Sequence, residues 1–383
     1  YSVWTKNGEY REQVKRLVTD YDNYISLKLA GDDAYLSEKM VGYPAELDEV
    51  YAESFEEQKK EWFSCVGDGI QECRNTWEHK KWNITDLPEF ELAITIDRPE
   101  LYYDFLQKDW TRFCHDYWKN NFLEHHTLSK KRVTRIYIGN QFCHNLFPRK
   151  ELLFQVLEKA LENNLAVTLA FSYIRNHLLE EIDELLQELE VWCQSREKEA
   201  GKDQEEIIVN DWAMPILLQG KPHLKPVLGV LLNKRRKDVR LPYKHGIGNH
   251  VDSLAENNLN CGFYQDYLKN TFDIQRFEFE SCGYKVTIPD GHHSLHLPFF
   301  QTNTSQYCTL YAVCRYGDRG KQKLPENCPR YCNKKVFLYP KHLKMVGRYN
   351  SLFGYDEKIL WDEKQLQDYL EQGIDRIVVN VSL

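Results

Sequence analysis

The chain of 383 residues lacks the features that mark membrane and nucleic-acid-binding proteins. No apolar run approaches the roughly 20 residues that a helix needs to cross a bilayer, and the opening run YSVWT does not resemble a signal peptide. Basic residues are not in excess, because 50 Lys and Arg stand against 58 Asp and Glu. We therefore expect no membrane partner and no bulk attraction to nucleic acid.

Familiar catalytic and nucleotide-binding motifs are missing as well. No G-x-G-x-x-G or Walker motif follows an expected strand. The sequence has neither G-x-S-x-G nor H-E-x-x-H, the signatures of serine hydrolases and zinc peptidases. Its one dense histidine stretch contains His292, His293 and His296. We interpret the first two as turn residues and the third as a histidine within a strand.

Cysteine, in contrast, is abundant. The odd count of 11 argues against a fully paired disulfide framework, and reduced cysteines fit a cytoplasmic protein. Six cysteines are scattered and are interpreted as small core residues: Cys65, Cys73, Cys114, Cys193, Cys261 and Cys282.

The hydrophobic pattern from residue 90 onward predicts a parallel sheet. Eight short apolar runs alternate with longer amphipathic stretches such as 150–163 and 178–195. A sheet of this kind that closes on itself is a (β/α)8 barrel, and an open doubly wound sheet is the alternative. The eight predicted strands are 90–96, 135–138, 166–171, 207–209, 227–231, 276–279, 294–297 and 336–338, and a last strand, 376–381, is expected to return to the body of the fold.

Two regions follow from this pattern. Residues 1–86 are rich in charge and aromatic side chains and are predicted to form a helical N-terminal extension, with helices at 11–28 and 54–62. Residues 87–383 are predicted to form the barrel, including a cysteine-rich segment at 308–332.

Polar residues directly follow several of the predicted strands. In a (β/α)8 barrel, chemistry is carried by the loops at this end of the strands. Asn140, Asn210, Asp211 and Asn233 are therefore candidates for a substrate pocket. The alternative is that they cap the helices that follow, because Asn and Asp are favoured at helix N-termini.

The strongest signal is a group of four cysteines in the last third of the chain. Cys308, Cys314, Cys328 and Cys332 are spaced C-x5-C-x13-C-x3-C. Thiolates are soft ligands that suit iron–sulfur clusters and zinc. Zinc ribbons and redox disulfides usually contain Cys-x2-Cys, which is absent here. Zinc and unrelated buried cysteines remain as alternatives.

These cysteines also carry a resemblance to a known family. The run Cys308…Cys314…Cys328-Pro-Arg-Tyr-Cys332 resembles the cysteine signature of the collagenase-like peptidase family U-thirty-two, which includes proteins for oxygen-independent hydroxylation of ubiquinone and of tRNA uridine. Three stretches, IYIGNQFC ending at Cys143, IIVNDW at 207–212 and LLNK at 231–234, resemble other segments of these relatives. The resemblance covers roughly residues 90–345, and the long N-terminal segment and the shorter cysteine spacer indicate a distant branch.

The resemblance implies a 4Fe-4S cluster on four cysteines, of which one comes from the early loop in some relatives. That ligand would be Cys143, which leaves five candidates for four places. It implies an oxygen-independent hydroxylase or related redox enzyme that acts on a small molecule or an RNA base. The alternatives are an accessory subunit of a heterodimer, in which the cluster is structural, and a peptidase, as the family name suggests.

RNA as a partner has one further observation in its favour. The basic run 234–237, followed by Arg240, could contact phosphates. Its simpler interpretation is a solvated helix face.

Overall fold

The structure is a computed structural model. It describes residues 7–15, 51–52, 87–200, 205–237, 239, 254–318, 320–321, 323–325, 327–338 and 344–382. Residues 8–15 form a helix, and Tyr10 packs its ring 3.9 Å from that of Phe263. The rest of the helix predicted at 11–28, and all of the helix predicted at 54–62, lie outside the described residues.

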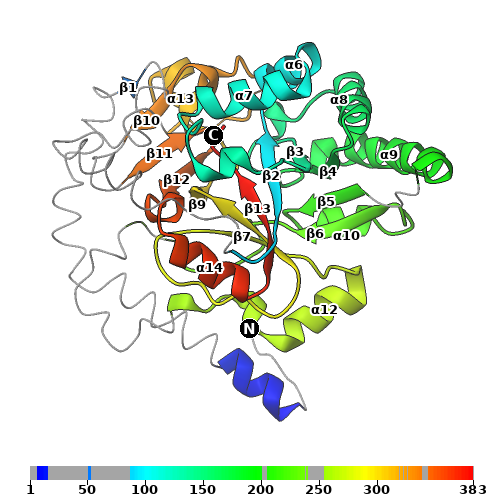
Figure 1. Ribbon diagram of the computed structural model, residues 1–383, viewed down its shortest axis with the longest axis vertical. Coiled ribbons are helices and arrows are strands. Elements are labelled where there is room, and N and C mark those ends of the chain that lie inside the picture. The colour runs from blue at the N-terminus through cyan, green and yellow to red at the C-terminus, as the bar shows by residue number, and fades with distance from the viewer. Residues whose placement is uncertain are drawn as a thin grey trace.

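Eight parallel strands form the centre of the fold (Figure 1). They are ordered β6-β5-β4-β3-β2-β13-β8-β7. The two outer strands of this order also meet, because Leu228 at the end of β6 forms a parallel bridge with Phe277 just before β7. The sheet is thus closed, and the predicted (β/α)8 barrel is confirmed. The strands are β2 (Glu91–Ile96), β3 (Arg135–Ile138), β4 (Ala166–Leu169), β5 (Glu205–Val209), β6 (Leu224–Leu228), β7 (Glu278–Glu280), β8 (His293–Leu297) and β13 (Ile374–Val379).

Helices follow most of the barrel strands and cover their outer surface (Figure 1). The α-helices are α6 (Pro99–Gln107), α7 (Trp110–Asn120), α8 (Lys150–Glu162), α9 (Leu179–Ala200), α10 (Ala213–Leu217), α12 (Gly262–Phe272), α13 (Thr309–Tyr316) and α14 (Glu363–Glu371). Short 3-10 helices are η2 (Thr127–Lys130), η3 (His144–Leu146), η4 (Asn176–Leu178), η7 (Asn258–Asn260), η8 (Tyr331–Asn333) and η10 (Lys358–Leu360). Within the described part of the chain, no helix is long and apolar enough to span a bilayer.

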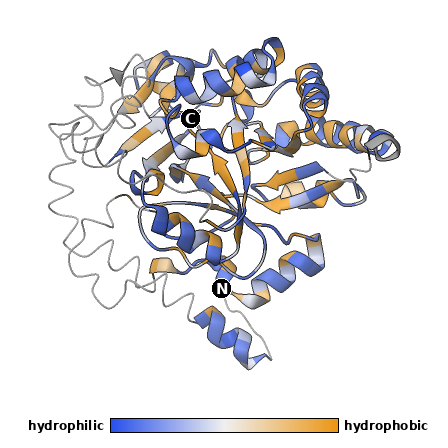
Figure 2. Ribbon diagram, in the orientation of Figure 1, coloured by the Kyte–Doolittle hydropathy of each residue, from blue (hydrophilic) through white to orange (hydrophobic). Residues whose placement is uncertain are grey.

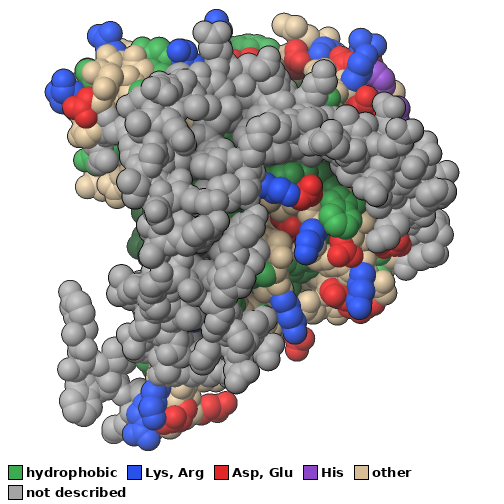
Figure 3. Space-filling view, turned by 90° about the vertical axis from the view of Figure 1, so that its left-hand side faces the viewer, with side chains coloured by type: hydrophobic (Ala, Val, Ile, Leu, Met, Phe, Trp, Pro, Cys, Tyr) green, Lys and Arg blue, Asp and Glu red, His purple; other side chains and the backbone are tan. Residues whose placement is uncertain are grey.

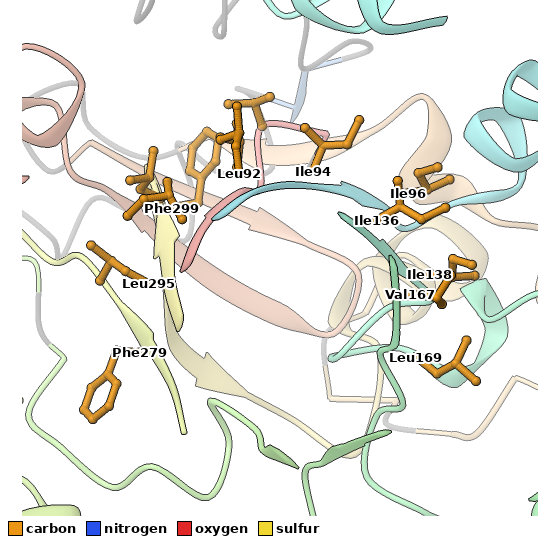
Figure 4. Packing of buried hydrophobic residues seen from close by; sticks show 14 of the residues in the cluster. Leu92, Ile94, Ile96, Ile136, Ile138, Val167, Leu169, Phe279, Leu295 and Phe299 are labelled. Carbon is orange, nitrogen blue, oxygen red and sulfur yellow. The ribbon is translucent and has the colours of Figure 1, made fainter. Parts of the chain in front are cut away.

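The main hydrophobic core lies between the barrel and its helices. Alternate strand residues, such as Leu92, Ile94 and Ile96 of β2, point away from the barrel axis and are fully buried (Figure 4). The barrel strands and the inner faces of α8 and α9 are accordingly hydrophobic (Figure 2). Successive strand residues alternate between the two faces, so the residues between these apolar positions point into the barrel.

The barrel interior is unusually polar at the end where the strands begin. Arg376 of β13 donates to both carboxylate oxygens of Glu206 on β5, at 2.6 and 3.0 Å. Arg135 donates to Glu91 (3.0 Å) and to Glu206 (3.3 Å). Burial alone would raise the pKa of Glu206, but the charges of Arg135 and Arg376 outweigh it and hold that pKa at about 2. Charged pairs therefore fill this layer of the barrel.

A second sheet is formed by four strands inserted between barrel strand β8 and helix α14, together with β1 from the N-terminal region. It is antiparallel, with the order β1-β10-β11-β12-β9. Its strands are β1 (Tyr51–Ala52), β9 (Phe299–Thr304), β10 (Val336–Leu338), β11 (Met345–Arg348) and β12 (Ser351–Tyr355). Because β9 continues directly from β8, the insertion begins at the end of the barrel where the strands finish.

This insertion corrects one prediction. The segment 336–338 was expected to be the eighth barrel strand, but it is β10 of the antiparallel sheet. The eighth barrel strand is β13, the last predicted strand, which pairs in parallel with both β2 and β8. The three apolar residues of this segment do not by themselves indicate which sheet the strand joins, because its pairing depends on residues distant in sequence.

Candidate functional site

The loop after β3 presents the first of the candidate cysteines. Its turn begins at Gly139, whose φ of +109° disfavours any residue with a side chain. The next residue, Asn140, is buried, and its Oδ1 accepts hydrogen bonds from the backbone N–H groups of Phe142 (3.0 Å) and Cys143 (2.9 Å). Its Nδ2 donates to the carbonyl of Asp97 at 3.3 Å. Asn140 therefore holds the Cys143 loop against the end of β2.

Cys308 is fixed at the start of helix α13. It occupies the N-cap position, and its Sγ accepts a hydrogen bond from the backbone N–H of Tyr311 at 3.3 Å. The same thiol donates to the carbonyl oxygen of Tyr349 at 3.0 Å. Tyr349 lies in the β11–β12 turn, so this contact joins the helix to the antiparallel sheet.

Cys328 and Cys332 lie on either side of a tight turn. The chain adopts a left-handed conformation at Arg330, with φ +55°, and then enters the 3-10 helix η8. Cys332 is buried in that helix, and its carbonyl accepts a hydrogen bond from Nε of Arg348 at 3.0 Å. The three-residue spacing thus brings both side chains to the same side of the insertion.

The four cysteines from these three segments line one cavity. Its other lining residues are mostly apolar or aromatic, which leaves the sulfur atoms as its main ligating groups. The space open within it is ≈ 20 Å³, about what one or two water molecules require. The lining consists of Cys143, Cys308, Cys328, Cys332, Asn145, Leu146, Leu310, Tyr311, Pro325, Tyr331 and Tyr349.

Burial holds Cys143, Cys308 and Cys332 in the protonated form. Burial raises the pKa of Cys143 to about 11 and that of Cys332 to about 12. The pKa of Cys308 also rises because of burial, and then because of the nearby Cys143. Each of these shifts includes a contribution from at least one other cysteine of the set, as expected for thiols in close proximity.

Cys314, the fifth candidate, does not line the cavity. It lies on α13, six positions after Cys308, and at about 100° per residue this spacing places it on a different side of the helix axis. Of the scattered cysteines, Cys193, Cys261 and Cys282 are buried and Cys114 is half-buried, in agreement with their interpretation as packing residues. Cys65 and Cys73 lie outside the described residues.

A wide groove adjoins the cysteine cavity. Its volume is ≈ 1170 Å³, and it shares Asn145, Pro325 and Cys328 with the cavity. The cavity and the groove therefore meet at Cys328. Basic side chains, histidines and the acids of α9 all line the groove, and Lys150 pairs with Glu188 of α9 at 2.9 Å. The ionisable residues among the lining are His144, Arg149, Lys150, Glu151, Arg175, His177, Glu181, Glu184, Glu188, Cys328 and Arg330.

The other polar candidates at the strand ends are engaged in local hydrogen bonds. Asp211 caps α10 as the alternative interpretation predicted, since its Oδ1 accepts from the backbone N–H groups of Ala213 (2.9 Å) and Met214 (3.2 Å). Asn210 donates to the carbonyl of Phe171 at 2.7 Å and accepts from the backbone N–H of Leu231 at 3.1 Å.

Asn233, the last of these candidates, donates to the carbonyl of Glu278 at 3.0 Å, and its Oδ1 is buried without a hydrogen-bond partner. The structure thus places Asn210, Asp211 and Asn233 at loop junctions. Their role in substrate binding stays a prediction.

A second small cavity, of ≈ 30 Å³, lies at the end of the barrel where the strands finish. Of the four polar candidates only Asn140 lines it. Sequence reasoning missed its acidic residues, Asp97 after β2 and Glu280 at the end of β7, although each follows an apolar strand. The lining is Thr95, Asp97, Tyr137, Gly139, Asn140, Gln141, Phe142, Ala170, Val230, Glu280, His296 and Asn380.

The histidine stretch splits as the sequence indicated. His292 is exposed, and His296 is buried inside the barrel. Its Nε2 forms a hydrogen bond with Glu278. His293 is also buried, its ring stacked on Phe277 at 4.8 Å, which corrects its interpretation as a turn residue: it is the first residue of β8.

The basic run 234–237 is not a solvated helix face. Arg235 and Lys237 are turned inward, and Lys237 Nζ lies 2.6 Å from the carboxylate of Glu280. Two of the four cations are thus used to neutralise a buried acid. On the face shown in Figure 3, basic and acidic side chains of the described residues are interspersed. Arg240 lies outside the described residues.

Two comparisons with known proteins gave no match. No protein-family model matches the chain, and no curated protein matches it. Within the described part of the chain, no group of three or more His, Cys, Asp or Glu residues is arranged so that it could hold a metal ion.

Proposed function

We propose that the protein binds a 4Fe-4S cluster through Cys143, Cys308, Cys328 and Cys332 and uses it in an oxygen-independent redox reaction. The observation that carries this proposal is the single cavity lined by these four thiols, which come from three separate segments of the chain. Buried free cysteines are common as packing residues, but four of them around one cavity equal the number of cysteine ligands that a 4Fe-4S cluster takes.

The composition of the lining fits such a centre. Iron–sulfur clusters take thiolate ligands in an environment where burial and hydrogen bonds tune their potential. Here no carboxylate or histidine lines the cavity, and a backbone N–H already points at Cys308 Sγ. The open space of ≈ 20 Å³ holds one or two water molecules, so binding of a cluster requires the loops that carry the thiols to move apart.

The spacing of the cysteines along the chain favours a cluster over zinc, because zinc ribbons usually contain Cys-x2-Cys, which is absent from this sequence.

The position of the cavity suggests how a substrate reaches it. The cavity adjoins a groove of ≈ 1170 Å³ that is wide enough for a small molecule or a flipped-out base. Arg149, Arg175 and Arg330 in the groove wall suit a ligand that carries negative charge. The resemblance of the cysteine signature to the family U-thirty-two points to hydroxylation without molecular oxygen as the reaction class.

A non-catalytic accessory subunit is the second candidate function. In that role the cluster would only fasten the insertion to the Cys143 loop, and the groove would receive a partner protein. The three-segment origin of the thiols favours this candidate equally, because a centre that ties distant segments together stabilises the fold.

Iron and acid-labile sulfide analysis of oxygen-free protein tests the cluster. We expect about four irons and four sulfides per chain in the wild type, and a large loss of both in Cys328→Ala. Cys193→Ala is the matched control, because Cys193 is buried on α9 away from the cavity. Zinc in place of iron, or equal iron in both variants, would contradict the proposal.

Comparison of metabolites and RNA nucleosides from cells with and without the protein separates the two candidate functions. A hydroxylated product that disappears in both the deletion and the Cys328→Ala strain would support the enzyme. An unchanged product profile, together with a partner that co-purifies only with cluster-loaded protein, would support the accessory subunit.

A further inference from the structure

The ≈ 30 Å³ cavity at the barrel mouth is lined by a buried acid, Asp97, that has one carboxylate oxygen without a hydrogen-bond partner. Asp97 follows β2 and is only 9% exposed, and its Oδ1 has no hydrogen-bond partner. Buried polar atoms are nearly always hydrogen-bonded, so an orphan carboxylate oxygen requires an explanation. Since Asp97 lines the cavity, the missing partner is a group that the cavity receives.

The acidic and basic neighbours of Asp97 at the mouth are already paired. Glu280 Oε2 lies 2.6 Å from Lys237 Nζ, and its Oε1 accepts from the backbone N–H of Gln301 at 2.7 Å. Lys237 also donates to the side-chain oxygen of Gln301 at 3.0 Å. Lys237, the cation that pairs with Glu280, is thus engaged.

The hydroxyl, phenol and amide groups of the lining are paired as well. Thr95 lies 2.7 Å from Ser382 Oγ, and Tyr137 donates to Glu278 at 3.1 Å. Asn380 accepts from the backbone N–H of Phe299 at 3.1 Å and donates to its carbonyl at 2.8 Å. Among the described lining residues, Asp97 Oδ1 is therefore the buried side-chain atom that is left without a partner.

We infer that the barrel mouth binds a hydrogen-bond donor group, a hydroxyl or an amine, of a small ligand, and that Asp97 Oδ1 accepts its hydrogen bond. An anionic group is disfavoured, because Asp97 and Glu280 line the cavity and no Lys or Arg of the described residues does. The open space of ≈ 30 Å³ admits only the donor group itself and one or two atoms beside it.

The location agrees with the fold. Ligands of (β/α)8 barrels bind at the ends where the strands finish, and Asp97 is the first residue after β2. The cavity contains none of the four thiols, but its Asn140 holds the Cys143 loop. A ligand at Asp97 is therefore separated from the cysteine cavity by one loop, and the site exists in protein with or without a cluster.

Ligand-observed NMR with three small probes tests the site on the full chain. Ethylene glycol presents a neutral donor, ethylammonium a charged donor, and propionate an acceptor of similar size. We expect at least one donor probe to bind the wild type saturably and propionate not to bind. Asp97→Asn should weaken donor binding about fivefold, because a neutral amide oxygen accepts a weaker hydrogen bond than a carboxylate does.

Two further variants make the outcome decisive. Asp356→Asn changes another buried acid, one that does not line this cavity, and should leave probe binding unchanged. Ala170→Val narrows the cavity without altering Asp97 and should abolish binding. Donor binding that is equal in wild type and Asp97→Asn, equal binding of propionate, or no saturable binding of any probe would show that Asp97 is satisfied by water alone and would overturn the inference.

Discussion

The side chain of Asn140 accepts a hydrogen bond from the backbone N–H of Cys143 at 2.9 Å. A residue at the barrel mouth thereby fixes the position of a thiol that faces the inserted segment. The same side chain lines the cavity that contains Asp97, so the two cavities share one support. Asn140 thus positions the Cys143 thiol indirectly, through its hydrogen bond to the backbone N–H of Cys143.

Replacement of Asn140 should weaken both the fold and the thiol site. In Asn140→Ala the N–H groups of Phe142 and Cys143 lose their acceptor, at a cost of about 2–4 kcal/mol for two buried donors. Urea unfolding and iron content after anaerobic reconstitution measure the two effects. Asn140→Asp keeps an acceptor oxygen and should retain most of the iron. Equal iron in Asn140→Ala and wild type would show that the loop needs no such support.

The two cysteines of α13 should behave differently. Cys308→Ala removes a thiol that lines the cavity, so reconstituted protein should lose most of its iron and sulfide. Cys314→Ala lies on the same helix but outside the cavity lining and should keep the wild-type content. The pair is well matched because both substitutions are conservative and the two positions, the N-cap and the sixth residue of α13, belong to the same eight-residue helix. Iron loss in Cys314→Ala would mean that the ligand set differs.

The ion pairs inside the barrel predict a loss of stability at low pH. The folded-state pKa of Glu206, about 2, lies below its ordinary value of 4.5. The stabilisation is therefore fully present above about pH 4.5 and is lost as the pH falls toward 2, with a total of about 3 kcal/mol. In urea unfolding, Glu206→Gln should be strongly destabilised at neutral pH and should approach the wild type as the pH is lowered.

An exposed pair provides the comparison for Glu206. Glu188→Gln removes a contact of 2.9 Å with Lys150 on the surface, and it should cost less than about 1 kcal/mol. A constant difference between wild type and Glu206→Gln from pH 6 to pH 3 would contradict the assignment of this carboxylate as a pH-dependent contributor.

Two buried acids should respond in opposite directions to the same substitution. Burial raises the pKa of Asp97, so its charged form lowers stability as the pH rises through that pKa. Asp97→Asn removes this penalty and should raise the free energy of unfolding at neutral pH. Burial raises the pKa of Asp356 as well, but this carboxylate accepts hydrogen bonds from Ile359 N–H (3.4 Å) and Gln365 (3.3 Å), which Asp356→Asn would disrupt, so that substitution should lower it. Thermal unfolding distinguishes the two, and a destabilised Asp97→Asn would mark Asp97 as a structural residue.

The barrel was predictable because its strands are buried on both faces. Runs such as Glu91–Ile96 and Arg135–Ile138 carry apolar residues that pack against helices, and this local pattern is independent of the remaining sequence. The inserted antiparallel sheet was not predicted. Strands such as Val336–Leu338 and Met345–Arg348 are three or four residues long, and only their partners distinguish them from barrel strands.

The cysteine set was predictable as a group but not in detail. Spacing indicated five candidates, and the direction of Cys314 on its helix was not resolved until the bounds of α13 were known. Asp97 could not be singled out from the sequence as a site residue, because a single acid after a strand is ordinary in a chain with 58 Asp and Glu residues. Its distinction is an unpaired oxygen, which depends on neighbours from β7, β8 and β13.

Strand β13 pairs with both β2 and β8, so the first barrel strand and the last meet side by side. During translation, residues 374–379 leave the ribosome only after every cysteine of the set has emerged. Until then the nascent chain has no finished barrel to hold Cys143 opposite the insertion. Assembly of the four thiols around one cavity consequently follows closure of the barrel by β13, long after the cysteines themselves have been synthesised.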